Sequence, residues 1–217
     1  MKTHNEFWVN GVREESVSAA DRGLEFGDGL FETMRYYQGN IIALDFHLRR
    51  LEKGLKRLFF PKTLSRVLSD LKIVIEHLTS LGAENVIVRI TVTRGVGARG
   101  YEPEVSPLVN IIIKALATDS SPIEQSPPIR AETADFRLSI QPGLAGIKHT
   151  NRLEQILGSL EKKHKRLDEL LLLNIDNAVA PTFKRCKILR RCDRICRTGR
   201  QSLRLTRSGT HRRHYFV

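Results

Sequence analysis

The pattern of apolar and polar positions predicts that the first half of the chain contains both strands and helices. Four stretches alternate or are rich in β-branched residues, and so predict strands: 7–14, 30–44, 85–95 and 107–117. The first two contain turn-forming residues, Asn10-Gly11 and Gln38-Gly39-Asn40, which are typical of β-hairpins. The sequence therefore predicts two hairpins followed, later in the chain, by two long strands.

Two helices are expected between the hairpins and the long strands. Leucines recur at helical spacing after Asp45, which stands where an N-cap belongs: Leu48, Leu51, Leu55 and Leu58. A second helix is predicted from about Thr63 to Leu81, ending at Gly82. Two hairpins, two helices and two long strands predict an N-terminal two-layer α/β domain over residues 1–117.

A second, smaller domain is predicted after a linker. Residues 118–128 are rich in Ser and Pro and lack apolar periodicity, so we interpret them as the linker. Beyond it, 129–140 predicts a strand, a helix begins at about Asn151, and 169–176 predicts a short buried strand. The predicted helix carries an apolar stripe made of Leu153, Ile156, Leu157 and Leu160. We therefore expect a partial C-terminal domain over residues 129–180, and an α/β (α+β) fold class overall.

The charge of the chain is concentrated at its C-terminus. The net charge is +12, but residues 1–180 hold 24 Lys and Arg against 23 Asp and Glu, whereas residues 181–217 hold the other 12 basic residues against Asp193 alone. The tail 181–217 has no sustained apolar period, so we expect it to be largely disordered. Nucleic-acid binding is thus unlikely for the body of the protein, and the tail alone remains an alternative site for it.

The remaining composition argues for a protein without a metal or a membrane segment. All three cysteines lie in the tail, at spacings that match no common zinc site, so no metal site is predicted. The chain contains no apolar run of 18 residues, and its first residues lack the apolar region of a secretory signal. We therefore expect a cytoplasmic protein.

One lysine stands in an unusual position. The stretch "LAGIKHTNRLEQ" (144–155) places Lys148 in an apolar bend directly before the predicted helix. A lysine there either extends its amine to solvent, or has its pKa lowered by apolar surroundings and nearby cations, which leaves an amine able to form a Schiff base. The spacing of the residues leaves both interpretations open.

Four ordered motifs favour the second interpretation. They are "DRGLEFGDGLFET" (21–33), "HLRRL" (47–51), "TRGVGARGY" (93–101) and "LAGIKHTNRLEQ" (144–155). Together they resemble the class IV (fold type IV) pyridoxal-phosphate enzymes, a family that includes branched-chain and D-amino-acid aminotransferases and aminodeoxychorismate lyase. The resemblance covers about residues 5–178, and the last two motifs are most similar to the lyase.

The resemblance implies a cofactor, a site and a reaction. The cofactor is pyridoxal 5'-phosphate, Lys148 is its Schiff-base lysine and proton shuttle, and Arg50 holds its phosphate. Phe31 lies near cofactor and substrate, and Arg94 and Arg99 receive substrate carboxylates, unless these loop arginines are merely solvated. The implied reaction converts 4-amino-4-deoxychorismate to 4-aminobenzoate and pyruvate, for folate synthesis. Relatives of this family are typically homodimers, so a homodimer is expected.

The sequence departs from the family at its C-terminal end. Relatives carry a glutamate and a hydroxyl-rich turn after the strand at 169–176, whereas here Ala180 and a basic stretch follow. We interpret the tail as the product of a reading-frame change near codons 178 to 181, which leaves the second domain incomplete. Translating the gene in the other frames tests this interpretation. The alternatives are an aminotransferase of the same family and a non-catalytic, truncated remnant.

Overall fold

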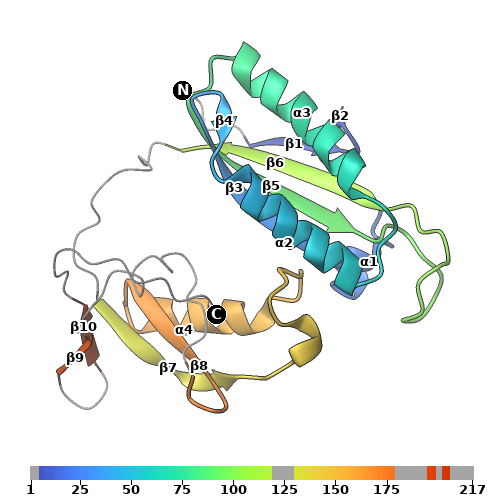
Figure 1. The fold of residues 1–217 in the computed structure, drawn as a ribbon. Helices are drawn as coiled ribbons and strands as arrows, with labels where there is room; N and C mark the ends of the chain where they lie inside the picture. The colour runs from blue at the N-terminus through green and yellow to red at the C-terminus, as the bar shows by residue number, and fades with distance from the viewer. Residues whose placement is uncertain (1–4, 119–129, 179–194, 199–201, 206–217) are drawn as a thin grey trace. The chain divides into compact units, whose positions relative to one another are not determined.

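The computed structural model describes residues 5–118, 130–178, 195–198 and 202–205. These residues form two compact units (Figure 1). The strands and helices of the first unit are β1 (Glu6–Val9), β2 (Val12–Arg13), α1 (Arg22–Glu25), β3 (Gly29–Tyr37), β4 (Asn40–Ile41), α2 (Leu44–Arg57), α3 (Leu64–Ser80), β5 (Asn85–Thr93) and β6 (Asn110–Ala117). The first unit also includes the later segment Pro142–Asn151, which begins with a short 3-10 turn, η1 (Pro142–Leu144).

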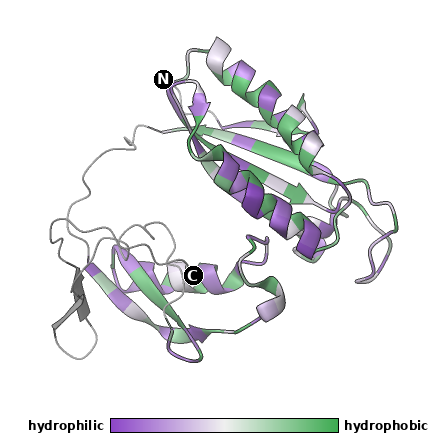
Figure 2. Ribbon diagram, viewed as in Figure 1, coloured by the Kyte–Doolittle hydropathy of each residue, from purple (hydrophilic) through white to green (hydrophobic). Residues whose placement is uncertain are grey.

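The first unit is a layer of helices on an antiparallel sheet. Its strand order is β2-β1-β6-β5-β3-β4, and α2 and α3 lie against one face (Figure 1). Strands β5 and β6 show mostly hydrophobic positions, whereas α2 is largely hydrophilic (Figure 2). Side chains of alternate residues point to opposite faces of a strand, so every second residue of the central strands enters the core between sheet and helices.

The elements predicted for the first unit are confirmed, with one exception. Both hairpins, the helix that stops before Gly82 and the two long strands are present. Asp45 is not the N-cap of α2. The helix begins one residue earlier, after Ala43 in the left-handed conformation (φ 57°), and no side chain caps it. Asp45 lies instead in the first turn, where its charge still suits the helix dipole.

The second unit is smaller and is built on another sheet. Its elements are β7 (Arg130–Leu138), α4 (Leu153–His164), β8 (Glu169–Asn174), β9 (Ile195–Thr198) and β10 (Ser202–Leu205). The strand order is β8-β7-β10-β9, and β7 and β8 are parallel. A parallel pair needs a crossover connection, and the stretch between these two strands contains α4. The mixed α+β character expected from the sequence is confirmed in both units.

Two expectations for the second unit are corrected. The apolar stripe of α4 is exposed rather than buried, because in the described residues the helix turns its other side, which includes the buried Gly158, toward its neighbours. The tail predicted to be disordered contains β9 and β10, which extend the sheet from β7 through backbone hydrogen bonds. The remainder of the tail and the linker predicted at 118–128, except Thr118, lie outside the described residues.

The segment that carries Lys148 belongs to the first unit, although the sequence placed it within the second domain. Ile147 is buried in the first unit's core, and His149 forms a β-bridge with Leu30. Because of these contacts the segment belongs to the first unit, although it follows β7 of the second unit along the chain. Within the part of the chain that the structure describes, no helix is long and apolar enough to span a membrane.

Candidate functional site

Lys148 is held by its backbone against the free edge of β3. The amide of Phe31 donates to the carbonyl of Lys148 (2.8 Å), and the amide of Thr150 donates to the carbonyl of Gly29 (2.9 Å). The hydroxyl of Thr150 also donates to Gly29 (3.1 Å). With Ile147 anchored in the core, these bonds fix the backbone from Ile147 onward against the sheet.

The amine of Lys148 lies over an aromatic ring. Its Nζ is 4.5 Å from the centroid of the Phe31 ring, and the guanidinium carbon of Arg89 lies 4.0 Å from the same centroid. Aromatic faces attract cations, so Phe31 brings two positively charged groups together beside one apolar surface. Phe31, the residue that the sequence placed near the cofactor, therefore contacts the predicted anchor lysine directly.

The next residue of β3, Glu32, points to the other face of the sheet, toward α2. Its side chain is 1% exposed. Arg50 donates from Nε to Oε1 and from Nη2 to Oε2, each at 2.6 Å, and Nδ1 of His47 lies 2.8 Å from Oε2. Two-point binding fixes both the position and the plane of a guanidinium. Glu32 therefore holds Arg50 in one orientation.

The charges around Glu32 compensate for its burial. Burial by itself would raise the pKa of Glu32, but hydrogen bonds from Arg50 and His47, together with the charges of Arg50 and Lys148, lower the pKa below its ordinary value. The same hydrogen bonds raise the pKa of Arg50. The carboxylate is thus ionised at neutral pH, and it lies close enough to Lys148 for the two charges to interact.

A pair of like charges lies on the face of the sheet opposite α2. Arg89 of β5 is directly opposite Lys114 of β6 in the register, and Thr33 of β3 flanks Arg89 on the other side. Burial lowers the pKa of Arg89. Like charges opposite each other destabilise a sheet, and among the described residues no carboxylate forms an ion pair with either cation. This pair therefore favours an anion between or above the two side chains.

The structure gives Arg94 a different role from the one expected. Its Nε donates to Asp28 (2.8 Å), and its two Nη atoms donate to the carbonyls of Phe59 and Leu58 (3.3 and 2.6 Å). The side chain is buried, and its donors are used by the protein itself. Arg94 therefore fixes the end of α2 to the turn before β3 and is not offered to a substrate. Arg99 lies exposed in the loop between β5 and β6.

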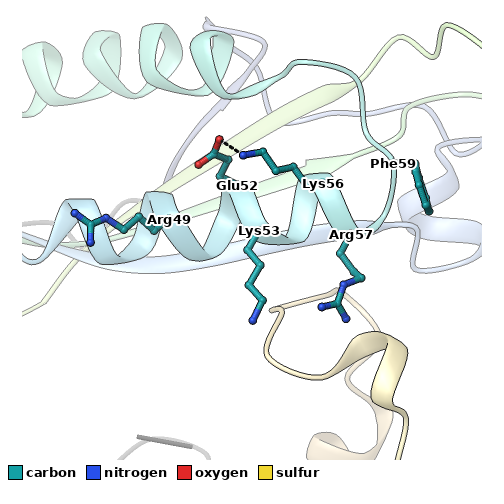
Figure 3. A pocket seen from close by; sticks show the side chains of 6 residues that line it. All are labelled: Arg49, Glu52, Lys53, Lys56, Arg57 and Phe59. Atoms are coloured by element: carbon teal, nitrogen blue, oxygen red, sulfur yellow. Dashed lines mark ion pairs between the residues drawn. The ribbon is translucent and has the colours of Figure 1, made fainter.

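The pocket in Figure 3 is distinct from this site. It has a volume of about 560 Å³ and lies along α2, lined by Arg49, Glu52, Lys53, Lys56, Arg57 and Phe59. Neither Lys148 nor Arg50 lines it, and its one acidic residue pairs with Lys56 (2.7 Å). Among the described residues, no group of His, Cys, Asp and Glu is arranged to hold a metal ion.

Sequence reasoning missed Glu32, Arg89 and Lys114. Because side chains alternate along a strand, Phe31 and Glu32 lie on opposite faces of the sheet. Arg89 and Lys114 become neighbours only through the pairing of β5 with β6, and Glu32 meets Arg50 and His47 only through the packing of α2 on the sheet. The signals available for Glu32 in the sequence were an acidic residue at a buried strand position and its place in the motif 21–33.

Comparison with known proteins gives a consistent result. The family model for class IV amino-transferases matches residues 29–182. An aminodeoxychorismate lyase of Vibrio harveyi is 33% identical over 184 residues, which is 81% of this chain and 64% of that protein. The crystal structure of 4-amino-4-deoxychorismate lyase from Pseudomonas aeruginosa superposes with a TM-score of 0.68 at 34% identity, covering 81% of this chain and 64% of the other.

A branched-chain amino acid aminotransferase from Escherichia coli has the same fold. It superposes with a TM-score of 0.68 over 83% of this chain and 61% of the other, at 18% identity, which is evidence for the fold alone. In each of these comparisons the chain spans less than two thirds of the relative's length. The strands and helices that the structure describes include those that hold Lys148, Arg50 and their neighbours.

Proposed function

Because the chain belongs to the class IV aminotransferase family, we propose that it binds pyridoxal 5'-phosphate through Lys148 and acts as a lyase on 4-amino-4-deoxychorismate, releasing 4-aminobenzoate and pyruvate. The observation that carries this proposal is the placement of the Lys148 amine over Phe31, where its charge helps to lower the pKa of Glu32, the partner of Arg50. The similarity to two lyases over four fifths of the chain supports the choice of reaction.

The residues present fit the cofactor. Pyridoxal phosphate needs an amine for its aldehyde and a cation for its phosphate, and Lys148 and Arg50 supply these groups. Two nitrogens of Arg50 bind Glu32, whereas no described residue accepts a hydrogen bond from Nη1. The Arg50 side chain is 44% exposed. A guanidinium held on one edge by a buried carboxylate can offer its other edge to a phosphate dianion.

The chemistry divides between cofactor and protein. Bound pyridoxal phosphate supplies an electron sink. Lys148 would hold the cofactor until the substrate amine displaces it, and the freed amine would then take the proton from the ring carbon that bears the substrate nitrogen. Phe31 keeps one side of the amine apolar, and Glu32 keeps Arg50 fixed. Aromatisation of the substrate ring drives the loss of pyruvate.

The substrate carries two carboxylates, and we assign their recognition to Arg89 and Lys114 in place of Arg94. The two cations are neighbours across β5 and β6, and Arg89 shares the Phe31 ring with Lys148. An anion there relieves the repulsion between them. Arg99, exposed in the adjoining loop, remains a second candidate for a carboxylate contact.

Arg89→Gln and Lys114→Gln are each expected to raise the KM for the substrate about tenfold and to leave the cofactor in place. The reason is the loss of one charge-assisted hydrogen bond, worth about 1.5 kcal/mol. Steady-state kinetics of both variants measures this effect. Arg35→Gln is the matched control, because Arg35 lies on the same face but donates to Asn85 (2.8 Å). An unchanged KM in both test variants would contradict the assignment.

The proposed reaction is tested by pyruvate release without a 2-oxo acid acceptor. The protein is incubated with the cofactor and 4-amino-4-deoxychorismate, and pyruvate and 4-aminobenzoate are quantified. Equal amounts of both products are expected. Turnover that depends on an added 2-oxo acid would identify an aminotransferase instead. Absence of any cofactor adduct after borohydride reduction would identify a non-catalytic remnant.

A further inference from the structure

Helix α2 contacts the bend that leads to Lys148. Arg57, in the last turn of α2, donates from Nη1 to the carbonyl of Gly143 (3.0 Å) and more weakly to that of Pro142 (3.4 Å). Figure 3 shows Arg57 and Lys53 extending from the helix toward this bend, whereas Arg49 extends away from it. The start of the bend is thus connected to the same helix that carries Arg50.

The position of Gly146 gives a second sign of this contact. Its φ of +75° is one that residues with a side chain rarely adopt, and the amine of Lys53 lies 3.1 Å from the place where a Cβ would stand. The backbone conformation therefore favours a glycine, and the absence of a side chain leaves room for the amine of Lys53 beside the bend. Arg57 of α2 thus contacts the start of the bend. Lys53 of α2 lies beside Gly146, two residues before Lys148.

The bend is weakly held by its own bonds. The amide of Ala145 reaches the carbonyl of Pro142 at 3.2 Å, and the amide of Ile147 reaches that of Leu144 at 3.4 Å. Pro142, Gly143, Ala145 and Gly146 are exposed. After Ile147, by contrast, the chain is fixed by β3. Before Ile147, Leu144 packs against the core, so freedom in the bend is confined to the exposed residues on either side of Leu144, unless another element restrains them.

We propose that Arg57 is a positioning residue for Lys148: it holds the entry of the bend against α2 and so sets Lys148 relative to Arg50. This inference rests on the proposed function, in which these two residues hold opposite ends of one rigid cofactor. A rigid ligand tolerates little variation in the spacing of its anchors. A link between the helix of one anchor and the bend of the other restrains that spacing before the ligand arrives.

The test compares Arg57→Met with the matched control Arg49→Met in the full chain. Arg49 is exposed on the same helix and loses the same charge when replaced. For Arg57→Met, we expect the amides of Ala145 and Ile147 to exchange hydrogen about fivefold faster. We also expect the fraction of Lys148 labelled by borohydride at limiting pyridoxal phosphate to fall severalfold. The melting temperature and the exchange of β5 amides should stay unchanged, as should all readouts for Arg49→Met.

Arg57→Lys is expected to recover part of the labelling, because an ammonium donates to the same carbonyls. Exchange and labelling equal to the wild-type values in Arg57→Met would overturn the inference. So would faster exchange throughout the first unit, because this result means that Arg57 merely stabilises the fold. If the wild-type protein itself takes no label, the proposed function fails, and the exchange measurement still decides whether Arg57 restrains the bend.

Discussion

Lys148→Ala is expected to abolish covalent attachment of the cofactor and to lower turnover by at least a thousandfold. In the proposed function the amine is both the attachment point and the base that moves the proton, and general-base catalysis alone contributes about a hundredfold to ten-thousandfold. Peptide mass spectrometry after borohydride reduction locates the adduct, and product release measures turnover. The side chain is only half-buried, so the fold should tolerate its loss.

Lys163→Ala is the control for this experiment. Lys163 is exposed in the last turn of α4, an element of the second unit. Its replacement should leave adduct and turnover at the wild-type level. Labelling of another lysine in the wild-type protein, or undiminished turnover in Lys148→Ala, would remove Lys148 from the role proposed for it.

Glu32→Ala is expected to give the largest loss of stability among single changes at the site, about 2 kcal/mol in the free energy of unfolding. It removes a buried carboxylate and leaves the side chains of Arg50 and His47 without their acceptor. The expected loss of stability is smaller than the full cost of breaking a buried ion pair, because the Arg50 side chain is 44% exposed and water can solvate it. Urea unfolding at pH 7 measures the difference.

The pH dependence of stability distinguishes what the charge of Glu32 contributes to the free energy of unfolding from what the shape of its side chain contributes. The pKa of Glu32 is lowered in the folded protein. Its ionisation therefore stabilises the fold above the ordinary carboxyl pKa of about 4.3. This stabilisation is lost as the pH falls through the lowered pKa. The difference in unfolding free energy between wild type and Glu32→Gln should thus be full at pH 7 and shrink below about pH 4. A constant difference would show that the charge contributes nothing.

The strands and helices of the first unit were predictable because their apolar residues recur at regular intervals. Leu51 and Leu55 of α2 and the alternating residues of β5 face the core as this pattern indicated. The N-cap assigned to Asp45 was wrong because a left-handed residue at Ala43 started the helix earlier. For α4, periodicity identified the helix and its stripe but not the exposure of that stripe, since burial depends on which element lies opposite.

The candidate site was predictable only where a residue belongs to a recognisable motif. Lys148 and Arg50 stand in such motifs. Glu32 also lies in one of them (21–33), but its role was recognised only through its bonds to α2. Arg94 shows the converse. It stands in a motif, but it donates hydrogen bonds to Asp28, Leu58 and Phe59 and so connects parts of the first unit. Residue type and loop position do not reveal whether a guanidinium is already paired.

The sequence by itself determined the fold class, through the periodicity of its apolar residues, and the family, through four motifs that resemble it. One of these motifs contains Lys148, the lysine proposed as the anchor of the cofactor. Only the tertiary structure decided which charged groups surround that lysine. Glu32 and Arg50 pair between a strand and a helix, Arg89 and Lys114 meet across two strands, and Arg57 reaches a bend 85 residues away. Such contacts depend on strand register and helix packing, so they become visible only once the chain has folded.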